Sequence, residues 1–350
     1  MHTRPESLPR EVTVRSQMNA VVLDRFGGVD ELSSREIAVP AVGEQDVLIR
    51  VQTAGVASWD AVERQGDYDG AFGVASTFPY VLGWDAAGTV AAVGSEVTRF
   101  EIGDRVYAAS TPVSRGGFYA EYGVVAAEHV ARVPERLSTE QAGVMAWDAL
   151  TALSGLDLLD LGPGQTLMVF GASGGMGHMA VQLARQRGIR VLAVSSGADG
   201  VALSQVNGAD AVVDGRTQDI LGAADEFAPD GIDAALITVG GQVTERSLRA
   251  VNRSGRVGWP HGVHPLPATP PAAPISYFDG DRSRAALERL NAAIEAGSFT
   301  PHVARSFPMA QVKEAHRALR DHYVGKLALS VAYDGTDANP EREGSEGTRL

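Results

Sequence analysis

A group of glycines between a buried strand and a helix is the part of the sequence best suited to chemistry. The strand is the apolar run Thr166 to Phe170, and from Met176 apolar residues recur at helical spacing. A glycine turn in this context brings backbone N–H groups to a helix N-terminus, where a pyrophosphate binds favourably. Because the spacing is G-x-x-G-x-x-G and not G-x-G-x-x-G, a turn that only packs the helix on the strand is the alternative. We predict a dinucleotide site whose turn consists of Gly171, Ala172, Ser173, Gly174, Gly175, Met176 and Gly177.

The end of the next predicted strand, Arg190 to Ser195, bears on which dinucleotide binds. An acidic residue there would hold the ribose of NAD. Ser195 and Ser196 occupy the position, which favours NADP over NAD. Because no Lys or Arg lies between Val191 and Val213, the nearest cationic candidate for the phosphate of NADP is Arg216.

Two different patterns of elements surround this turn. Up to Pro134, short strand-like runs separated by Gly and Pro are typical of an antiparallel, barrel-like domain. Beyond Pro134, strands and helices alternate, which predicts a doubly wound parallel sheet. The early strands are expected at Ala20 to Leu23, Asp46 to Thr53, Ala86 to Val93, Gly103 to Tyr107 and Glu121 to Val125. The later strands are expected at Thr166 to Phe170, Arg190 to Ser195, Ala211 to Val213, Ile232 to Thr238 and Gly255 to Trp259.

One predicted helix precedes the glycine turn. It covers Thr139 to Leu153, with Ser138 as N-cap and Gln141 completing a capping box. Further helices are expected at Met176 to Arg187, Thr244 to Val251, Arg282 to Ala296 and Met309 to Asp321, before a last strand at Leu327 to Ala332.

Length and composition exclude several functions. The 350 residues suffice for two domains, the formal net charge is −13, and there is no cysteine. The acidic charge argues against nucleic acid, RNA included, and against anionic membranes as partners. The lack of cysteine excludes disulfides, thiol nucleophiles and cysteine-based zinc sites. We predict a flexible arm at 1–17 without a signal peptide, a disordered tail at 334–350 and a cytoplasmic protein.

Several segments resemble, in the same order, the medium-chain dehydrogenase/reductase superfamily, and within it the zinc-free quinone oxidoreductases, zeta-crystallin-like proteins and enoyl reductases. The segments are G-V-A-S-W-D from Gly55, F-P-Y-V-L-G-W-D-A-A-G-T-V from Phe78, V-G-S-E-V-T-R-F-E-I-G-D-R-V from Val93, G-G-F-Y-A-E-Y from Gly116, T-V-G-G from Thr238 and F-P-M-A-Q-V-K-E-A-H-R-A-L from Phe307. The resemblance covers residues 18 to about 333. It implies an α/β protein in which a Rossmann-type doubly wound parallel sheet (141–278) is inserted into a split, mainly antiparallel, β-barrel-like (GroES-like) catalytic domain (18–140 plus 279–333), with the site in the cleft.

The resemblance also predicts a reaction without metal. Zinc-dependent members hold a cysteine where this chain has Ala57 and a histidine where it has Trp84, and neither residue can ligate zinc. Without a Lewis acid, the alkoxide that forms from a simple ketone lacks stabilisation, whereas a conjugated acceptor spreads the charge into an enolate. We therefore expect reduction of an activated alkene or of a quinone-like substrate.

The expected substrate pocket departs from that of the zinc-free relatives, which often hold Asn at Ala57 and Tyr at Val62. Tyr68 lies in the segment that usually overhangs the substrate, so its hydroxyl is the predicted donor to the enolate. A loop aromatic that only packs is the alternative.

Asp60 matches a family Asp and is the second catalytic candidate, although it could only orient the backbone. Trp84, Arg64 and Ala57 are predicted to line the pocket. Core burial of Trp84 and a solvated helix charge for Arg64 are the alternatives.

For the cofactor, the resemblance places Thr151 beside the nicotinamide and Lys326 near the cleft, adds Val239 and Gly240 of T-V-G-G, and matches Arg216 to an N-Y-R-like segment. The predicted protein is a metal-free, NADPH-dependent reductase of an apolar, conjugated small molecule, acting as a homodimer. Two alternatives stay open. One is a biosynthetic reductase whose hydride addition to a polyene or enone triggers ring closure. The other is a non-catalytic NADPH-binding protein, which the loss of the Asn and Tyr positions favours.

Overall fold

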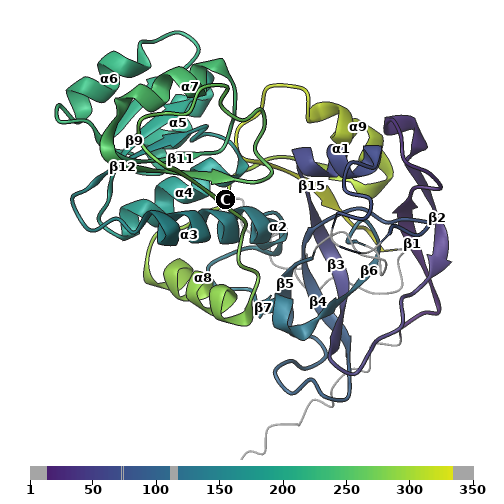
Figure 1. Ribbon diagram of the computed structural model, residues 1–350. Coiled ribbons are helices and arrows are strands. Elements are labelled where there is room, and N and C mark those ends of the chain that lie inside the picture. The colour runs from purple at the N-terminus through teal and green to yellow at the C-terminus, as the bar shows by residue number, and fades with distance from the viewer. Residues whose placement is uncertain (1–13, 72, 74, 111–116, 334–350) are drawn as a thin grey trace, which may run out of the picture.

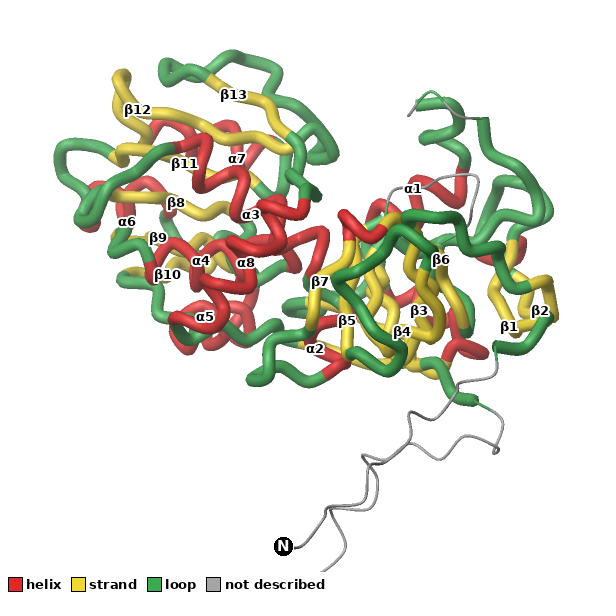
Figure 2. The backbone as a smooth tube through the Cα atoms, turned by 90° about the horizontal axis from the view of Figure 1, so that it is seen from below, coloured by secondary structure: helices red, strands yellow, loops and turns green. Residues whose placement is uncertain are grey.

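The computed structural model of the chain describes residues 14–333 except 72, 74 and 111–116, and forms two lobes (Figures 1 and 2). Each lobe is built on a sheet of its own. The predicted tail and residues 1–13 of the predicted arm lie outside the described residues, and Gln17 already belongs to the first strand.

One lobe holds a six-stranded sheet in which all strands are parallel, as the alternation of strands and helices predicts. The strand order is β10-β9-β8-β11-β12-β13. The strands are β8 (Thr166–Phe170), β9 (Arg190–Ser195), β10 (Ala211–Asp214), β11 (Ile232–Ile237), β12 (Val251–Pro260) and β13 (Ile275–Phe278). The helices between or beside them are α3 (Ala146–Leu159), α4 (Gly175–Gln186), α5 (Gly197–Val206), α6 (Ile220–Phe227), α7 (Gln242–Ser247) and α8 (Arg284–Ala296).

The central strand β8 is buried on both faces, which explains its uninterrupted apolar sequence. Leu167 and Val169 pack with residues of α3, α4 and α8, while Met168 and Phe170 pack with residues of α6 on the opposite face. Because successive side chains of a strand point to opposite faces and both faces are buried, every side chain of β8 must be apolar or hydrogen-bonded.

The other lobe holds a mainly antiparallel sheet of seven strands. Six follow the order β14-β15-β3-β4-β5-β7, β6 also pairs with β3, and only β14 and β15 are parallel among the described pairs. These strands are β3 (Asp46–Val56), β4 (Asp85–Val93), β5 (Arg105–Ala109), β6 (Tyr122–Ala126), β7 (Val130–Arg132), β14 (Val303–Pro308) and β15 (Lys326–Ser330). A separate hairpin joins β1 (Gln17–Val22) to β2 (Ser33–Ala38), and the helices of this lobe are α1 (Ser58–Gln65), α2 (Thr139–Gly143) and α9 (Val312–Ala318). Since β15 pairs with β3, segments that precede and follow the parallel lobe in the sequence build one sheet.

The predicted helix over Thr139 to Leu153 is wrong in one respect, because two helices replace it. Ser138 and Gln141 form the expected capping box of α2, but α2 ends at Gly143. A Cβ on Gly143 would lie 2.7 Å from the Cβ of Thr53, so α2 stops where its backbone meets β3. The next helix starts anew at Ala146, where the Asp85 carboxylate accepts the backbone N–H of Trp147 at 2.6 Å.

No helix in the described part of the chain is long and apolar enough to cross a membrane. The strands β8, β9 and β11 end at the same edge of the parallel sheet, and the glycine turn follows β8 there. This edge faces the lobe that carries α1 and β15 (Figure 1).

Candidate active site

The glycine turn has the geometry of an anion site. Gly174 is the N-cap of α4, and among the described residues no side chain caps this helix. The first N–H groups of a helix lack intrahelical acceptors, so they are available to a phosphate. Gly171 has φ of +83°, and a Cβ on Gly177 would overlap the carbonyl of Gly171. The turn therefore requires glycine at both positions, and its residues fit a dinucleotide.

Two other predicted cofactor residues lie against this turn. The side chain of Val239, which is 51% exposed, lies 2.9 Å from the position of a Cβ on Gly171. Gly240 packs on the backbone of His264 and Pro265. Ser173 accepts the backbone N–H of Gly325 with its carbonyl at 2.8 Å, which ties the turn to the segment just before β15.

The two serines predicted at the end of β9 make different contacts. The Ser195 hydroxyl bonds to the Ser204 hydroxyl at 2.7 Å inside the fold, and only the N–H of Ser196 reaches the turn, at the Ser173 hydroxyl 3.3 Å away. An acidic residue, Asp214, lies beside the end of β9. It stands at the end of the neighbouring strand β10 and accepts the backbone N–H groups of Gly197 and Arg216. These hydrogen bonds lower the pKa of Asp214.

Arg216 has a partner that sequence reasoning did not find. Its guanidinium contacts Nδ1 of His322 at 3.1 Å, and Nε2 of His322 lies 2.8 Å from the Asp199 carboxylate. Because a guanidinium can only donate, Nδ1 accepts and Nε2 carries the proton that Asp199 accepts. The sequence gives no sign of this contact, because Arg216 and His322 are isolated residues that lie 106 positions apart.

Lys326 is buried and ion-paired. Its Nζ lies 2.6 Å from the Asp148 carboxylate and 3.8 Å from that of Asp85, and the residue is 3% exposed. Burial opposes the charge, but the two carboxylates raise the pKa of Lys326 above its usual value. A Cβ on Gly175 would lie 2.5 Å from Asp148 and 2.8 Å from the Lys326 side chain. The pair therefore lies directly beside the N-terminus of α4.

Thr151 lies one turn beyond Trp147 in α3. Its hydroxyl donates to the Trp147 carbonyl at 2.8 Å, and it packs against Gly280, where a Cβ would lie 2.6 Å from that hydroxyl.

Asp60 is fully buried and holds the first turn of α1. Its Oδ2 accepts the backbone N–H of Ala57 at 2.7 Å and the Tyr119 hydroxyl at 3.0 Å. Burial raises the pKa of Asp60 to about 7, against the effect of these hydrogen bonds. Ala57, 6% exposed, is the N-cap of this helix.

Arg64 is not a solvated helix charge. It is 2% exposed, its Nε donates to the Gly27 carbonyl at 3.1 Å, and its guanidinium contacts Nδ1 of His316 at 2.7 Å. Burial and the adjacent guanidinium lower the pKa of His316 to about 3, so this imidazole is neutral. These contacts link α1 to α9.

Trp84 is buried, 5% exposed, and is the centre of an aromatic cluster. Its ring centroid lies 4.6 Å from that of Trp147, 5.8 Å from that of Tyr68 and 5.9 Å from that of Trp59. Burial, with the neighbouring carboxylates of Glu63 and Asp60, raises the pKa of the Tyr68 phenol. Tyr68 is therefore a neutral hydrogen-bond donor near pH 7.

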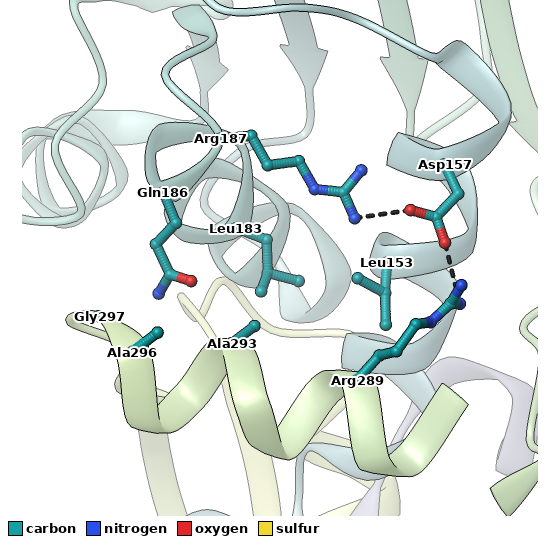
Figure 3. Close-up of a pocket in the computed structure, with 9 residues that line it drawn as sticks. All are labelled: Leu153, Asp157, Leu183, Gln186, Arg187, Arg289, Ala293, Ala296 and Gly297. Atoms are coloured by element: carbon teal, nitrogen blue, oxygen red, sulfur yellow. Dashed lines mark hydrogen bonds and ion pairs between the residues drawn. The ribbon is translucent and has the colours of Figure 1, made fainter. Parts of the chain in front are cut away.

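A pocket of about 470 Å³ lies elsewhere, between α3, α4 and α8 (Figure 3). Asp157 at its rim binds Arg187 at 2.7 Å and Arg289 at 2.9 Å. None of the predicted site residues lines it, so we do not assign the reaction to this pocket.

Comparisons with known proteins agree with this arrangement. The family model "Alcohol dehydrogenase GroES-like domain" matches residues 43–135, and "Zinc-binding dehydrogenase" matches residues 207–329. Quinone oxidoreductase of Homo sapiens is 30% identical over 317 residues, covering 87% of this chain and 94% of that protein. The chloroplastic NADPH-dependent alkenal/one oxidoreductase of Arabidopsis thaliana is 30% identical over 330 residues, covering 91% and 81%. A solved structure of a mycobacterial protein complexed with NADPH is 28% identical with a TM-score of 0.78, covering 89% and 99%.

Fold and site thus define a two-lobed oxidoreductase that uses a nicotinamide cofactor and a small-molecule substrate. The chain belongs to the medium-chain dehydrogenase/reductase superfamily, in its quinone oxidoreductase-like branch, which confirms the predicted family and fold class.

One matching family model is named for zinc. Among residues 14–333, without 72, 74 and 111–116, no three His, Asp or Glu side chains come together as metal ligands. The metal-free reaction stays a prediction.

Proposed function

We propose that the chain is an NADPH-dependent, metal-independent reductase of α,β-unsaturated carbonyl compounds and quinones. The observation that carries this proposal is the contact of Tyr68 with Trp84, because a neutral phenol stands next to an indole that replaces a metal ligand of zinc-dependent relatives. The named activities of the human and Arabidopsis relatives support the same reaction class.

In this proposal the N-terminus of α4 holds the pyrophosphate of NADPH. Arg216 is the candidate contact for the additional phosphate, and His322, whose Nδ1 accepts from the guanidinium, holds it in place. Thr151 and Val239 are proposed to lie toward the nicotinamide, which supplies the hydride when bound.

Residues of the chain then have to stabilise the negative charge that develops on the acceptor. As the β-carbon of the acceptor gains hydride, the electron pair of the double bond moves toward the carbonyl oxygen, and the hydroxyl of Tyr68 donates a hydrogen bond to that oxygen. The α-carbon finally takes a proton from solvent. Asp60 is proposed as a positioning residue for α1, because its carboxylate is committed to Ala57 and Tyr119.

We also propose a homodimer. Among the described strands β13 is the last at one edge of the parallel sheet, and it carries Tyr277, which is 44% exposed, so it is the candidate surface for a second copy.

The proposed function is tested by NADPH oxidation with matched acceptors: an enone, its saturated ketone and a quinone, each with and without chelator. We expect the enone and the quinone to turn over, the ketone to be inert, and chelation and elemental analysis to reveal no required zinc. Faster turnover of the ketone, or loss of activity in chelator, would contradict the proposal. Tight NADPH binding without oxidation by any acceptor would favour the non-catalytic alternative.

A further inference from the structure

A buried carboxyl group that the proposed reaction does not use holds the indole of Trp84. Glu63, in α1, is 2% exposed. Its Oε2 accepts the indole N–H of Trp84 at 2.7 Å, and its Oε1 accepts the hydroxyl of Tyr80 at 2.5 Å. Burial raises the pKa of Glu63 to about 8, and the neighbouring Asp60 adds to this effect. Burial of the Glu63 carboxyl group is unfavourable, and its two hydrogen bonds offset part of that cost. The same hydrogen bonds orient the side chains of Trp84 and Tyr80.

Three other aromatic rings contact the ring of Trp84. Trp59, Tyr68 and Trp147 all contact the Trp84 ring and, unlike it, are only half-buried. They come from α1, from the segment after α1 and from α3, so the Trp84 indole is the common support of side chains from both lobes.

These rings lie next to the cofactor turn. The Nζ of Lys326 is 4.6 Å from the centroid of the Trp59 ring, and the same side chain packs against Gly175 at the start of α4. One side chain, that of Lys326, therefore lies between the aromatic cluster and the predicted pyrophosphate site.

We propose that Glu63 is a positioning residue that, by holding Trp84, fixes the rings of Trp59, Tyr68 and Trp147 as a stacking surface for acceptors that carry a planar aromatic or quinonoid ring. The inference rests on the proposed reductase function. Offset stacking of such a ring favours planar acceptors over aliphatic chains of similar polarity.

Two variants of nearly equal size separate the hydrogen bonds of Glu63 from its bulk. Glu63→Gln retains both contacts, because its amide oxygen accepts from Trp84 and its amide N–H donates to Tyr80. Glu63→Met fills the space but holds neither partner. In Glu63→Met we expect KM for a phenyl-substituted enone to rise about three- to tenfold while KM for an alkyl enone changes by less than about twofold. Glu63→Gln should behave like the parent protein, and both variants should keep the parent Kd for NADPH.

The indole N–H resonance of Trp84, identified with Trp84→Phe, gives a readout that needs no turnover. It should shift in Glu63→Met and stay in place in Glu63→Gln. If none of the acceptors supports oxidation of NADPH by the parent protein, the proposed function fails. The resonance still tests whether Glu63 holds Trp84 in that case.

Should Glu63→Met not fold, Trp59→Leu removes part of the stacking surface without touching Glu63, and it should raise KM for the phenyl enone alone. The inference is overturned by any of three results. KM rises equally for both enones, Glu63→Gln behaves like Glu63→Met, or the Trp84 indole N–H resonance has the same chemical shift in Glu63→Met as in the parent protein.

Discussion

Tyr68 is the residue on which the proposed chemistry depends most. Its phenol is protonated near pH 7, as burial raises its pKa further above the ordinary value, and it can donate to an oxygen that gains charge. Tyr68→Phe should lower kcat by roughly ten- to a thousandfold, the usual effect of one lost donor, and leave the Kd of NADPH unchanged. Tyr277→Phe, at an exposed position in β13, is the matched control. An unchanged kcat in Tyr68→Phe would assign the donor role to another group.

Single side chains show where prediction from sequence ends. The glycines of the turn could be identified because their backbone geometry requires them at fixed spacing. Glu63 and His322 could not, because a lone charged residue looks solvated until the fold supplies Trp84 or Arg216 as its partner. For the same reason the contact of Arg64, a predicted pocket residue, with His316 could not be predicted, because the two lie 252 residues apart in sequence.

At the scale of elements, the parallel strands were predictable and the break between α2 and α3 was not. The bounds of β8 and β9 match their apolar runs, since burial on both faces leaves a continuous signal. The break at residues 144–145 depends on Thr53 and Asp85, which lie in strands far away in sequence. A local pattern carries no information about such contacts.

The segment after β10 and the segment before β15 together set the proposed preference for NADPH. Arg216→Ala should weaken NADPH binding by about 1.5–3 kcal/mol, or roughly ten- to a hundredfold in Kd, and leave NADH binding unchanged. Asp199→Asn should act in the opposite direction, because it removes a negative charge beside His322. Titrations of both cofactors measure this, with Arg253→Ala, an exposed arginine in β12, as control. Equal affinities of the parent protein for both cofactors would contradict the preference.

At the scale of the whole molecule, buried contacts join the two lobes behind the glycine turn. His178 in α4 donates from Nδ1 to the Gly174 carbonyl at 2.8 Å and accepts the backbone N–H of His302 at its Nε2 at 2.9 Å. The contact with His302 requires a neutral ring, because a protonated Nε2 cannot accept, and burial lowers the pKa of His178 from 6.5 to about 4.

Acidification should therefore weaken the fold through His178. Between about pH 6.5 and pH 4 the unfolded chain binds a proton that the folded chain does not, so the free energy of unfolding falls as the pH falls. In His178→Gln the loss between pH 7 and pH 5 should be smaller by about 2 kcal/mol, measured by urea unfolding. An identical slope in His178→Gln would show that this histidine is not held neutral.

The position to which the hydride goes is the most direct test of the account. The enone is reduced with NADPH that carries deuterium at the transferred position of C4, and NMR of the product locates the label. We predict deuterium at the β-carbon of a saturated ketone, because a hydrogen bond from Tyr68 stabilises the delocalised charge of an enolate better than the localised charge of an alkoxide. Deuterium at the carbonyl carbon of an alcohol would contradict the account.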